Sequence, residues 1–248
     1  MSSRVSSKHR WGLRVVTIAV LVGIGCLLAV AARAADAPTG PGGEKLVPLE
    51  VKFPRPLFQG TPKNIKASPT MEKYSEKPRA PFYVPKGMVN LALKKPVTSS
   101  DSAPIIGELS MATDGDKEGY DGSYVELGPD TQWLQVDLGK PSDICAIVVW
   151  HYHAEGRVYH DTVIQVSDDP EFATGVQTVY NNDFDNSSKL GLGKQLEYID
   201  DFRGKLIDAK TAKSPFVRGR YVRFYSKGNT SNDLNHYVEV EIFGKPAE

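Results

Sequence analysis

One segment, residues 131–150, constrains the fold of this chain more than any other. Its sequence is TQWLQVDLGKPSDICAIVVW. Apolar and polar residues alternate over residues 133–138, which predicts a β-strand with one face in a core. Turn-forming residues follow at 139–143, and residues 144–150 are an almost continuous apolar run. Because this run is short and rich in β-branched side chains, we expect a second, largely buried strand rather than a helix.

The remainder of the C-terminal part has a similar texture. From residue 88 onward, short alternating segments are separated by Gly, Asn, Asp and Pro, and no stretch shows a helical period. This pattern is typical of an all-β sandwich. A single domain over residues 88–244 is long enough to bury roughly 70% of its unfolded-chain surface and to fold alone. The expected strands are residues 133–138, 144–150, 162–167, 178–180, 197–199, 221–225 and 237–243.

The N-terminus predicts a secretory signal peptide over residues 1–34. A basic start precedes an uncharged, mainly apolar run at 15–32, and Ala32-Arg33-Ala34 fits a small-x-small cleavage site. The run is also just long enough to span a bilayer, so an uncleaved membrane anchor is the alternative. We therefore expect a secreted or periplasmic protein, which contacts a membrane only through this segment if the segment is kept.

Charge and cysteine content narrow the function further. Cleavage after Ala34 would remove five basic residues and no acidic one from a chain with 30 of each, which leaves a formal net charge of −5. A nucleic-acid binder needs a basic face, so we expect no nucleic-acid partner. Only Cys145 would remain after cleavage, so no intramolecular disulfide can form. Its place in the apolar run predicts a buried, unreactive side chain.

Residues 35–87 differ from the domain that follows. They contain ten prolines and no sustained periodicity, which excludes long helices and central strands. We expect a linker or a wrapping arm, with residues 46–53 extended and residues 82–84 packed at the domain edge. Residues 245–248 are expected to form a short tail.

Six sequence blocks of the domain occur together in a fixed order. They are NLA with PVTSS (90–100), ATDGD (112–116), WLQVDLG (133–139), IQVSDD (164–169), GRYVRF (219–224) and VEVEIFG (238–244). In this order and spacing they resemble the discoidin domain, or coagulation factor five/eight type C domain, of the galactose-binding-like superfamily. Bacterial carbohydrate-binding modules share that fold. The resemblance implies a jelly-roll β-sandwich of two antiparallel sheets whose loops at one end bind a ligand, but it does not identify the ligand.

An acidic turn indicates a cation site. Asp114 and Asp116 flank Gly115, and calcium takes six to eight oxygen ligands of this kind. Taken alone, the turn also fits an Asp that caps its own backbone. The resemblance implies a structural calcium ion, and the matching positions are Asp114, Asp116, Glu239, the Ala112 carbonyl and Ser123. The chain departs from the family pattern at Ser123-Tyr124-Val125, where Thr-x-Trp is usual.

Polar loops indicate a sugar site. Three histidines follow the apolar run, and residues 181–188 and 227–237 are dense in short amides and carboxylates. Amides, imidazoles, an Arg and aromatic rings suit a sugar, because its hydroxyls need bidentate partners and its C–H face stacks on a ring. The same loops also fit ordinary Asx turns. The candidate ligand-binding residues are His151, His153, Arg157, His160, Asn182, Asn229 and Tyr237.

Two other functions are weaker predictions. A His-x-His pair with a third histidine nearby is typical of a transition-metal site, but its spacing matches no closed zinc motif. No nucleophile elbow, phosphate loop or His-Glu-x-x-His motif is present, so we do not expect an enzyme. The sequence favours a secreted, bacterial-type binding module with a glycan or cell-surface polysaccharide as its partner. A protein-interaction or structural adhesion module is the alternative.

Overall fold

The computed structural model describes residues 38–40, 43–211 and 214–248. The predicted signal peptide lies outside these residues. Among them, no helix is long and apolar enough to cross a membrane. The described part contains one short 3-10 helix, η1 (Leu109–Thr113), and is otherwise built of strands and loops.

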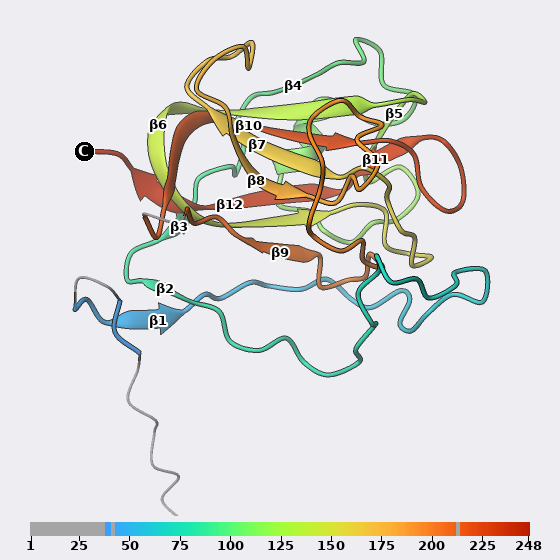
Figure 1. Ribbon diagram of the computed structural model, residues 1–248, viewed down its shortest axis with the longest axis horizontal. Coiled ribbons are helices and arrows are strands. Elements are labelled where there is room, and N and C mark those ends of the chain that lie inside the picture. Colours follow the sequence, from blue (N-terminus) through green and yellow to red (C-terminus); the bar gives the residue numbers. More distant parts are fainter. Residues whose placement is uncertain (1–37, 41–42, 212–213) are drawn as a thin grey trace, which may run out of the picture. The chain divides into compact units, whose positions relative to one another are not determined.

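Twelve strands are described, and every pairing between them is antiparallel. The prediction of an all-β, antiparallel jelly-roll sandwich is confirmed (Figure 1). The strands are β1 (Leu46–Pro48), β2 (Tyr83–Pro85), β3 (Val89–Asn90), β4 (Val97–Ser99), β5 (Val125–Leu127), β6 (Gln132–Trp150), β7 (Val163–Ser167), β8 (Gln177–Asn181), β9 (Lys205–Asp208), β10 (Val217–Ser226), β11 (Asn235–Tyr237) and β12 (Glu239–Pro246).

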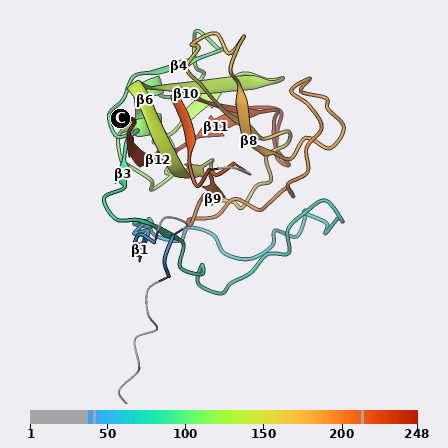
Figure 2. The ribbon, with the colours of Figure 1, turned by 60° about the vertical axis from the view of Figure 1, so that its left-hand side comes forward.

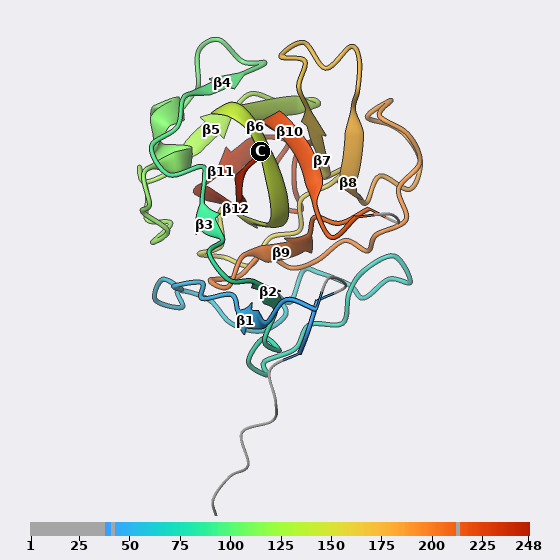
Figure 3. The ribbon, with the colours of Figure 1, turned by 90° about the vertical axis from the view of Figure 1, so that its left-hand side faces the viewer.

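Strand β6 runs through both layers of the sandwich. Its first half pairs with β4 and β10, and its second half pairs with β9 and β12 (Figure 3). The predicted break at 139–143 is therefore wrong, because the neighbouring strands continue to pair across it, as in Arg218 with Asp143. Gly139 instead allows a bend, with φ of +85° and its N–H donated to Asp137 Oδ1 at 2.7 Å.

The apolar run in β6 is buried on two sides. Ile147 and Val149 belong to the core between the two layers, whereas Ala146, Val148 and Trp150 belong to a second apolar cluster. In that cluster they pack with residues of the segment before the sandwich, among them Val84. A strand that is covered on both faces needs no polar alternation, which explains the sequence of this run.

The segment over residues 43–87, which we call the arm, covers the outer face of the β12–β6–β9 layer (Figures 1 and 2). Within it β1 pairs with β2. The Glu72 N–H donates to the Glu197 carbonyl, and the Glu197 N–H donates to the Thr70 carbonyl, both at 2.8 Å. These contacts are those of a wrapping arm rather than of a free linker.

The other predicted strands agree with the structure to different extents. Residues 162–167 and 178–180 overlap β7 and β8, and residues 221–225 lie within the longer β10. Residues 237–243 are divided into β11 and β12, and residues 197–199 form only an isolated bridge from Glu197 to Met71.

Cys145 is buried and free, its Sγ lies 3.3 Å from the Phe243 carbonyl oxygen, and burial raises the pKa of its thiol to about 12. These features agree with the predicted unreactive side chain.

Gly204 immediately precedes β9 and lies where the arm contacts the sandwich. Its φ is +62°, and a Cβ there would lie 2.6 Å from Trp150 Cε2, while its carbonyl accepts a hydrogen bond from Arg79. We expect Gly204→Ala to lower the free energy of unfolding by about 2 kcal/mol, measured by urea denaturation, because strain and overpacking add. Gly175→Ala is the control, since Gly175 has φ of +63° and nothing within 4 Å of a Cβ. An equal loss of unfolding free energy in Gly204→Ala and Gly175→Ala would show that packing against Trp150 does not contribute.

Candidate functional site

Three loops meet at one end of the sandwich, toward the right in Figure 1: residues 151–162 after β6, 182–204 after β8 and 227–234 after β10. Backbone hydrogen bonds join them. The Lys227 N–H donates to the His160 carbonyl at 2.9 Å, and the Asn182 N–H donates to the Thr162 carbonyl at 3.1 Å. The Asp200 N–H donates to the Arg157 carbonyl at 2.8 Å. The structure thus brings together the loops in which the sequence predicts a ligand site.

A hollow of about 480 Å³ lies between these loops, and we call it the loop-end hollow. Thr70 of the arm forms part of its wall. The other residues that line it are His160, Asp161, Asn182, Phe184, Asp185, Ser187, Glu197 and Lys227.

The loop-end hollow offers donors, acceptors and an apolar ring. His160 Nδ1 lies 3.0 Å from Glu197 Oε1, and this hydrogen bond raises the pKa of His160. Lys227 Nζ donates to Ser187 Oγ at 3.0 Å and lies 3.9 Å from Asp161 Oδ2. Phe184 is 38% exposed. An arrangement of this kind can bind a neutral ligand that carries both hydroxyls and an apolar face.

Three carboxylates gather at one side of the hollow. One oxygen from each of Asp161, Asp183 and Asp185 lies within 4.8 Å of the others. Burial, together with the other two carboxylates, raises the pKa of Asp161. Among the described residues this is the only such group of three, and it contains no histidine. The histidines of the described residues form no such group of three, and a transition-metal site stays an untested alternative.

Two of the seven predicted ligand-binding residues line the hollow. The His160 side chain is 43% exposed. Asn182 is buried, and its Oδ1 accepts the Thr162 N–H at 2.6 Å, so its side chain helps to hold two of the loops together.

Of the other five predicted residues, four lie elsewhere in the loops and Tyr237 lies in β11. His151, His153 and Tyr237 are completely buried, and the His151 ring stacks on Tyr159 with centroids 4.3 Å apart. His153 Nε2 donates to the Lys117 carbonyl at 2.9 Å, and the Tyr237 hydroxyl donates to the Phe224 carbonyl at 3.1 Å.

Asn229 and Arg157 also have partners within the loops. Asn229 is buried and forms its side-chain hydrogen bonds within its own turn, to Ser231, Asn232 and Leu234. The Arg157 guanidinium lies 4.5 Å from the centroid of the Tyr152 ring. That these five residues bind a ligand stays a prediction, and the contacts described hold the loops in place.

Beneath the loops lies a buried chain of hydrogen bonds that the sequence analysis did not identify. The Tyr159 hydroxyl lies 2.9 Å from His236 Nδ1, and His236 Nε2 lies 2.9 Å from Glu126 Oε2. Burial, followed by the charge of Arg157, lowers the pKa of His236 to about 3. The imidazole is therefore neutral at pH 7. It donates a hydrogen bond from Nε2 to the Glu126 carboxylate and accepts one at Nδ1 from the Tyr159 hydroxyl.

Several residues of the loop-end hollow were also missed. Phe184, Asp185 and Ser187 belong to the run 181–188, and an aromatic ring within such an Asx-rich loop is a signal that could have identified them. Thr70 and Glu197 carry no comparable signal, because only the packing of the arm against the sandwich brings them to the hollow.

The acidic turn lies against the start of β12. Glu239 is completely buried, its Oε2 accepts the Gly115 N–H at 3.2 Å, and its Oε1 is buried without a partner. Burial raises the pKa of Glu239 to about 9, and the nearby Asp114 carboxylate acts in the same direction. Asp114 Oδ1 accepts the Asp116 N–H at 2.7 Å.

These residues fit a hard cation at Glu239 and Asp114, because an unpartnered, buried carboxylate oxygen beside a second carboxylate is an arrangement that calcium stabilises. Ala112 is completely buried in η1, and the Ser123 N–H donates to the Tyr120 carbonyl at 2.9 Å. Among the described residues, Asp114, Asp116 and Glu239 do not form as tight a group as the three carboxylates of the loop-end hollow. Calcium binding by the predicted set of five stays a prediction.

Comparison with known families agrees with this architecture. Residues 111–199 match the F5/F8 type C family model described as "NedA-like, galactose-binding domain". Over residues 111–199, the resemblance to the galactose-binding-like, factor five/eight type C domain is thereby confirmed. No curated protein matches the chain.

Three of the solved structures to which this chain is similar are the following. The CBM32 of AlyQ, in complex with 4,5-unsaturated mannuronic acid, is 20% identical over 60% of this chain and 93% of its own, with a TM-score of 0.43. A family 89 glycoside hydrolase from Clostridium perfringens is 21% identical over 64% of this chain and 15% of its own, with a TM-score of 0.46. A fucolectin from Morone saxatilis (striped bass) serum is 19% identical over 64% and 49%, with a TM-score of 0.43.

Proposed function

We propose that this protein is an exported, non-catalytic carbohydrate-binding module and that the loop-end hollow binds the sugar. The observation that carries the proposal is the side-chain composition of that hollow. The carboxylates of Asp161, Asp185 and Glu197 accept hydrogen bonds, Lys227 donates them, and the exposed Phe184 ring offers an apolar surface. A saccharide uses acceptors, donors and an apolar surface. Each of its hydroxyls both donates and accepts hydrogen bonds, and the C–H face of the sugar ring stacks on aromatic side chains.

Size and family support the proposal. The volume of about 480 Å³ falls within the range of small-ligand sites, which is roughly 300–1,000 Å³. The family description names a galactose-binding domain. The basic, then apolar first 34 residues support export, and an exported protein whose mass corresponds to a chain that begins at Ala35 would establish cleavage.

We further propose a structural calcium ion at the acidic turn, held by Glu239 and Asp114. The unpartnered Glu239 Oε1 supports it, because burial disfavours the ionised carboxylate and a bound cation would supply the missing partner. When bound, the ion would neutralise this carboxylate and join the turn after η1 to the start of β12.

A glycan array followed by calorimetric titration tests sugar binding. We expect the purified protein to bind at least one class of neutral glycan and Phe184→Ala to weaken that binding about tenfold, because stacking on an aromatic ring contributes roughly 1–1.5 kcal/mol. Tyr120→Ala is the matched control, since Tyr120 is 39% exposed, Phe184 is 38% exposed, and Tyr120 lies outside the hollow.

Two results would contradict the proposal. If a folded protein bound no sugar at high concentration, the protein-interaction alternative would take its place. If sugar binding were weakened equally in Phe184→Ala and Tyr120→Ala, the site would lie outside the loop-end hollow.

A further inference from the structure

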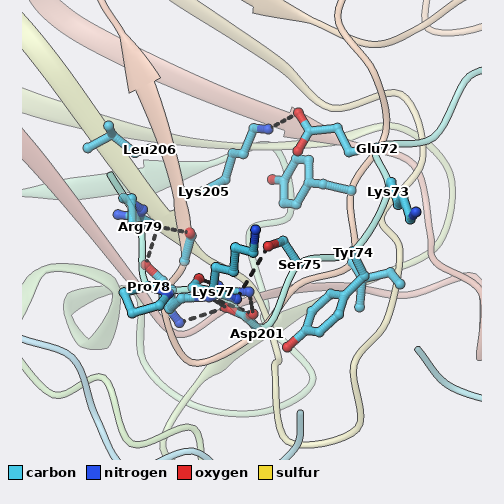
Figure 4. Close-up of a pocket in the computed structure, with 14 residues that line it drawn as sticks. Glu72, Lys73, Tyr74, Ser75, Lys77, Pro78, Arg79, Asp201, Lys205 and Leu206 are labelled. Atoms are coloured by element: carbon cyan, nitrogen blue, oxygen red, sulfur yellow. Dashed lines mark hydrogen bonds and ion pairs between the residues drawn. The ribbon is translucent and has the colours of Figure 1, made fainter. Parts of the chain in front are cut away.

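A second hollow lies between the arm and the segment that leads into β9, and we call it the arm pocket (Figure 4). Its volume is about 370 Å³. Five cationic and two acidic side chains take part in its wall, so the charge of the lining is positive at neutral pH. These side chains are Lys73, Lys77, Arg79, Arg203 and Lys205, with Glu72 and Asp201.

Both carboxylates of the arm pocket are already paired. Asp201 Oδ2 accepts a hydrogen bond from Arg203 Nε at 2.9 Å, and Glu72 pairs with Lys205 across the opening (Figure 4). Within the described part of the chain, Lys73, Lys77 and Arg79 have no carboxylate within 4.0 Å. The arm therefore contributes three cations that form no ion pair with a carboxylate.

Two hydrogen-bond donors of the wall also have no partner. Arg79 Nη2 donates to the carbonyls of Arg203 and Gly204, whereas its Nη1 is buried and unpartnered. Tyr198 is 6% exposed, and its hydroxyl is buried and unpartnered. Buried donors without acceptors are unfavourable, so a ligand that supplies acceptor oxygens would stabilise this arrangement. Burial, and then the neighbouring Arg203 guanidinium, lower the pKa of Arg79, which agrees with an excess of positive charge.

We propose that the arm pocket binds an oxyanion, a carboxylate or a sulfate group, at a site separate from the loop-end hollow. Guanidinium, ammonium and hydroxyl donors form short, charge-assisted hydrogen bonds with such groups. Tyr74 lies in the same wall, and the Arg203 guanidinium is 5.4 Å from the centroid of its ring, so the ring offers a surface beside the charged groups. A sugar that carries a carboxylate can use both features. Because the arm supplies Lys73, Lys77 and Arg79, the site exists only while the arm is docked.

Calorimetric titration of the purified protein at constant ionic strength tests the proposal. The probes are D-glucuronate, D-glucose as its neutral counterpart, and inorganic sulfate. We expect D-glucuronate to bind more tightly than D-glucose, and this difference to persist in Phe184→Ala, in which the loop-end hollow is impaired. Sulfate that binds as well as D-glucuronate would indicate recognition of the oxyanion alone, whereas tighter D-glucuronate binding would show that the sugar ring contributes.

Matched variants locate the site. The double variant Lys73→Ala, Lys77→Ala should weaken D-glucuronate binding about tenfold, because two charged contacts are lost. The double variant Lys63→Ala, Lys66→Ala makes the same change in charge on the same arm, at exposed residues outside the pocket, and should change binding less than about twofold. Tyr198→Phe removes only a hydroxyl and should weaken binding severalfold without changing the charge.

Three results would overturn the proposal: equal binding of D-glucose and D-glucuronate, equal losses in the two double lysine variants, or no binding of either anion. Phe184→Ala should leave D-glucuronate binding unchanged. A failure of sugar binding at the loop-end hollow can thus be distinguished from a failure of anion binding at the arm pocket.

Discussion

Removal of divalent metal by a strong chelator should lower the melting temperature (Tm) of this protein by roughly 5–10 °C. A ligand that binds only the folded state stabilises it by about 2.7 kcal/mol at a hundredfold excess over its Kd. For a domain of this size, 1 kcal/mol shifts Tm by about 2–4 °C. The physical reason is Glu239, whose carboxylate is completely buried and has one unpartnered oxygen near Asp114. Scanning calorimetry with chelator, and then with added calcium, measures the effect.

Two variants of β12 make this test specific. Glu239→Gln removes the charge but keeps an oxygen to accept the Gly115 N–H, so its Tm should respond neither to chelator nor to calcium. Glu241→Gln is the control, because Glu241 lies on the same strand and forms its ion pair with Lys117 at 2.7 Å. It should keep the calcium response. A wild-type Tm that stays unchanged after complete metal removal would contradict the calcium proposal.

Acid should destabilise the protein through His236. Its pKa is about 3 in the folded protein and near the ordinary value of 6.5 in the unfolded chain. Between these values the unfolded state binds a proton that the folded state does not, so stability is fully present above pH 6.5 and is lost as the pH falls toward 3. The loss amounts to at most about 1.4 kcal/mol per pH unit. Burial raises the pKa of Glu126, the partner of His236, and this opposes part of the loss.

The pH dependence of urea unfolding between pH 7 and pH 5 measures this effect. His236→Gln removes the titrating group, so its stability should fall less steeply with acid, whatever its absolute stability. His160→Gln is the matched control. The hydrogen bond to Glu197 raises the pKa of His160, so His160 adds stability as the pH falls, and its removal should make the loss steeper. A wild-type profile identical to that of His236→Gln would show that His236 does not cause the acid sensitivity.

The sequence predicted the class of fold because its signals are local. Alternation over residues 133–138 and the apolar run over 144–150 identify strands directly, and both halves of β6 lie where they were expected. The continuity of β6 could not be predicted, since Gly139 and Pro141 are typical of turns and only pairing with β10 and β12 keeps the strand intact. The short strands β3, β4, β5 and β9 have too few residues to show a period.

The site was less predictable than the fold. Residue type identified the loops, but it could not distinguish His160, which is partly exposed in the loop-end hollow, from His151, which is stacked in the interior. That distinction depends on which face of the loop packs against Tyr159, a tertiary contact. The sequence contains no signal for the arm pocket, because Lys73 and Lys77 look like ordinary solvent-exposed lysines. Only the fold brings them into one pocket with Arg203.

The bend in β6 has a consequence for how this protein unfolds. Because one strand supplies the centre of both layers, the loss of either layer would leave half of β6 without its partners. The second half of β6 also holds the arm through Ala146, Val148 and Trp150. We therefore expect the two layers and the arm to unfold as one cooperative unit, so that amide hydrogens on both halves of β6 exchange at a common, slow rate.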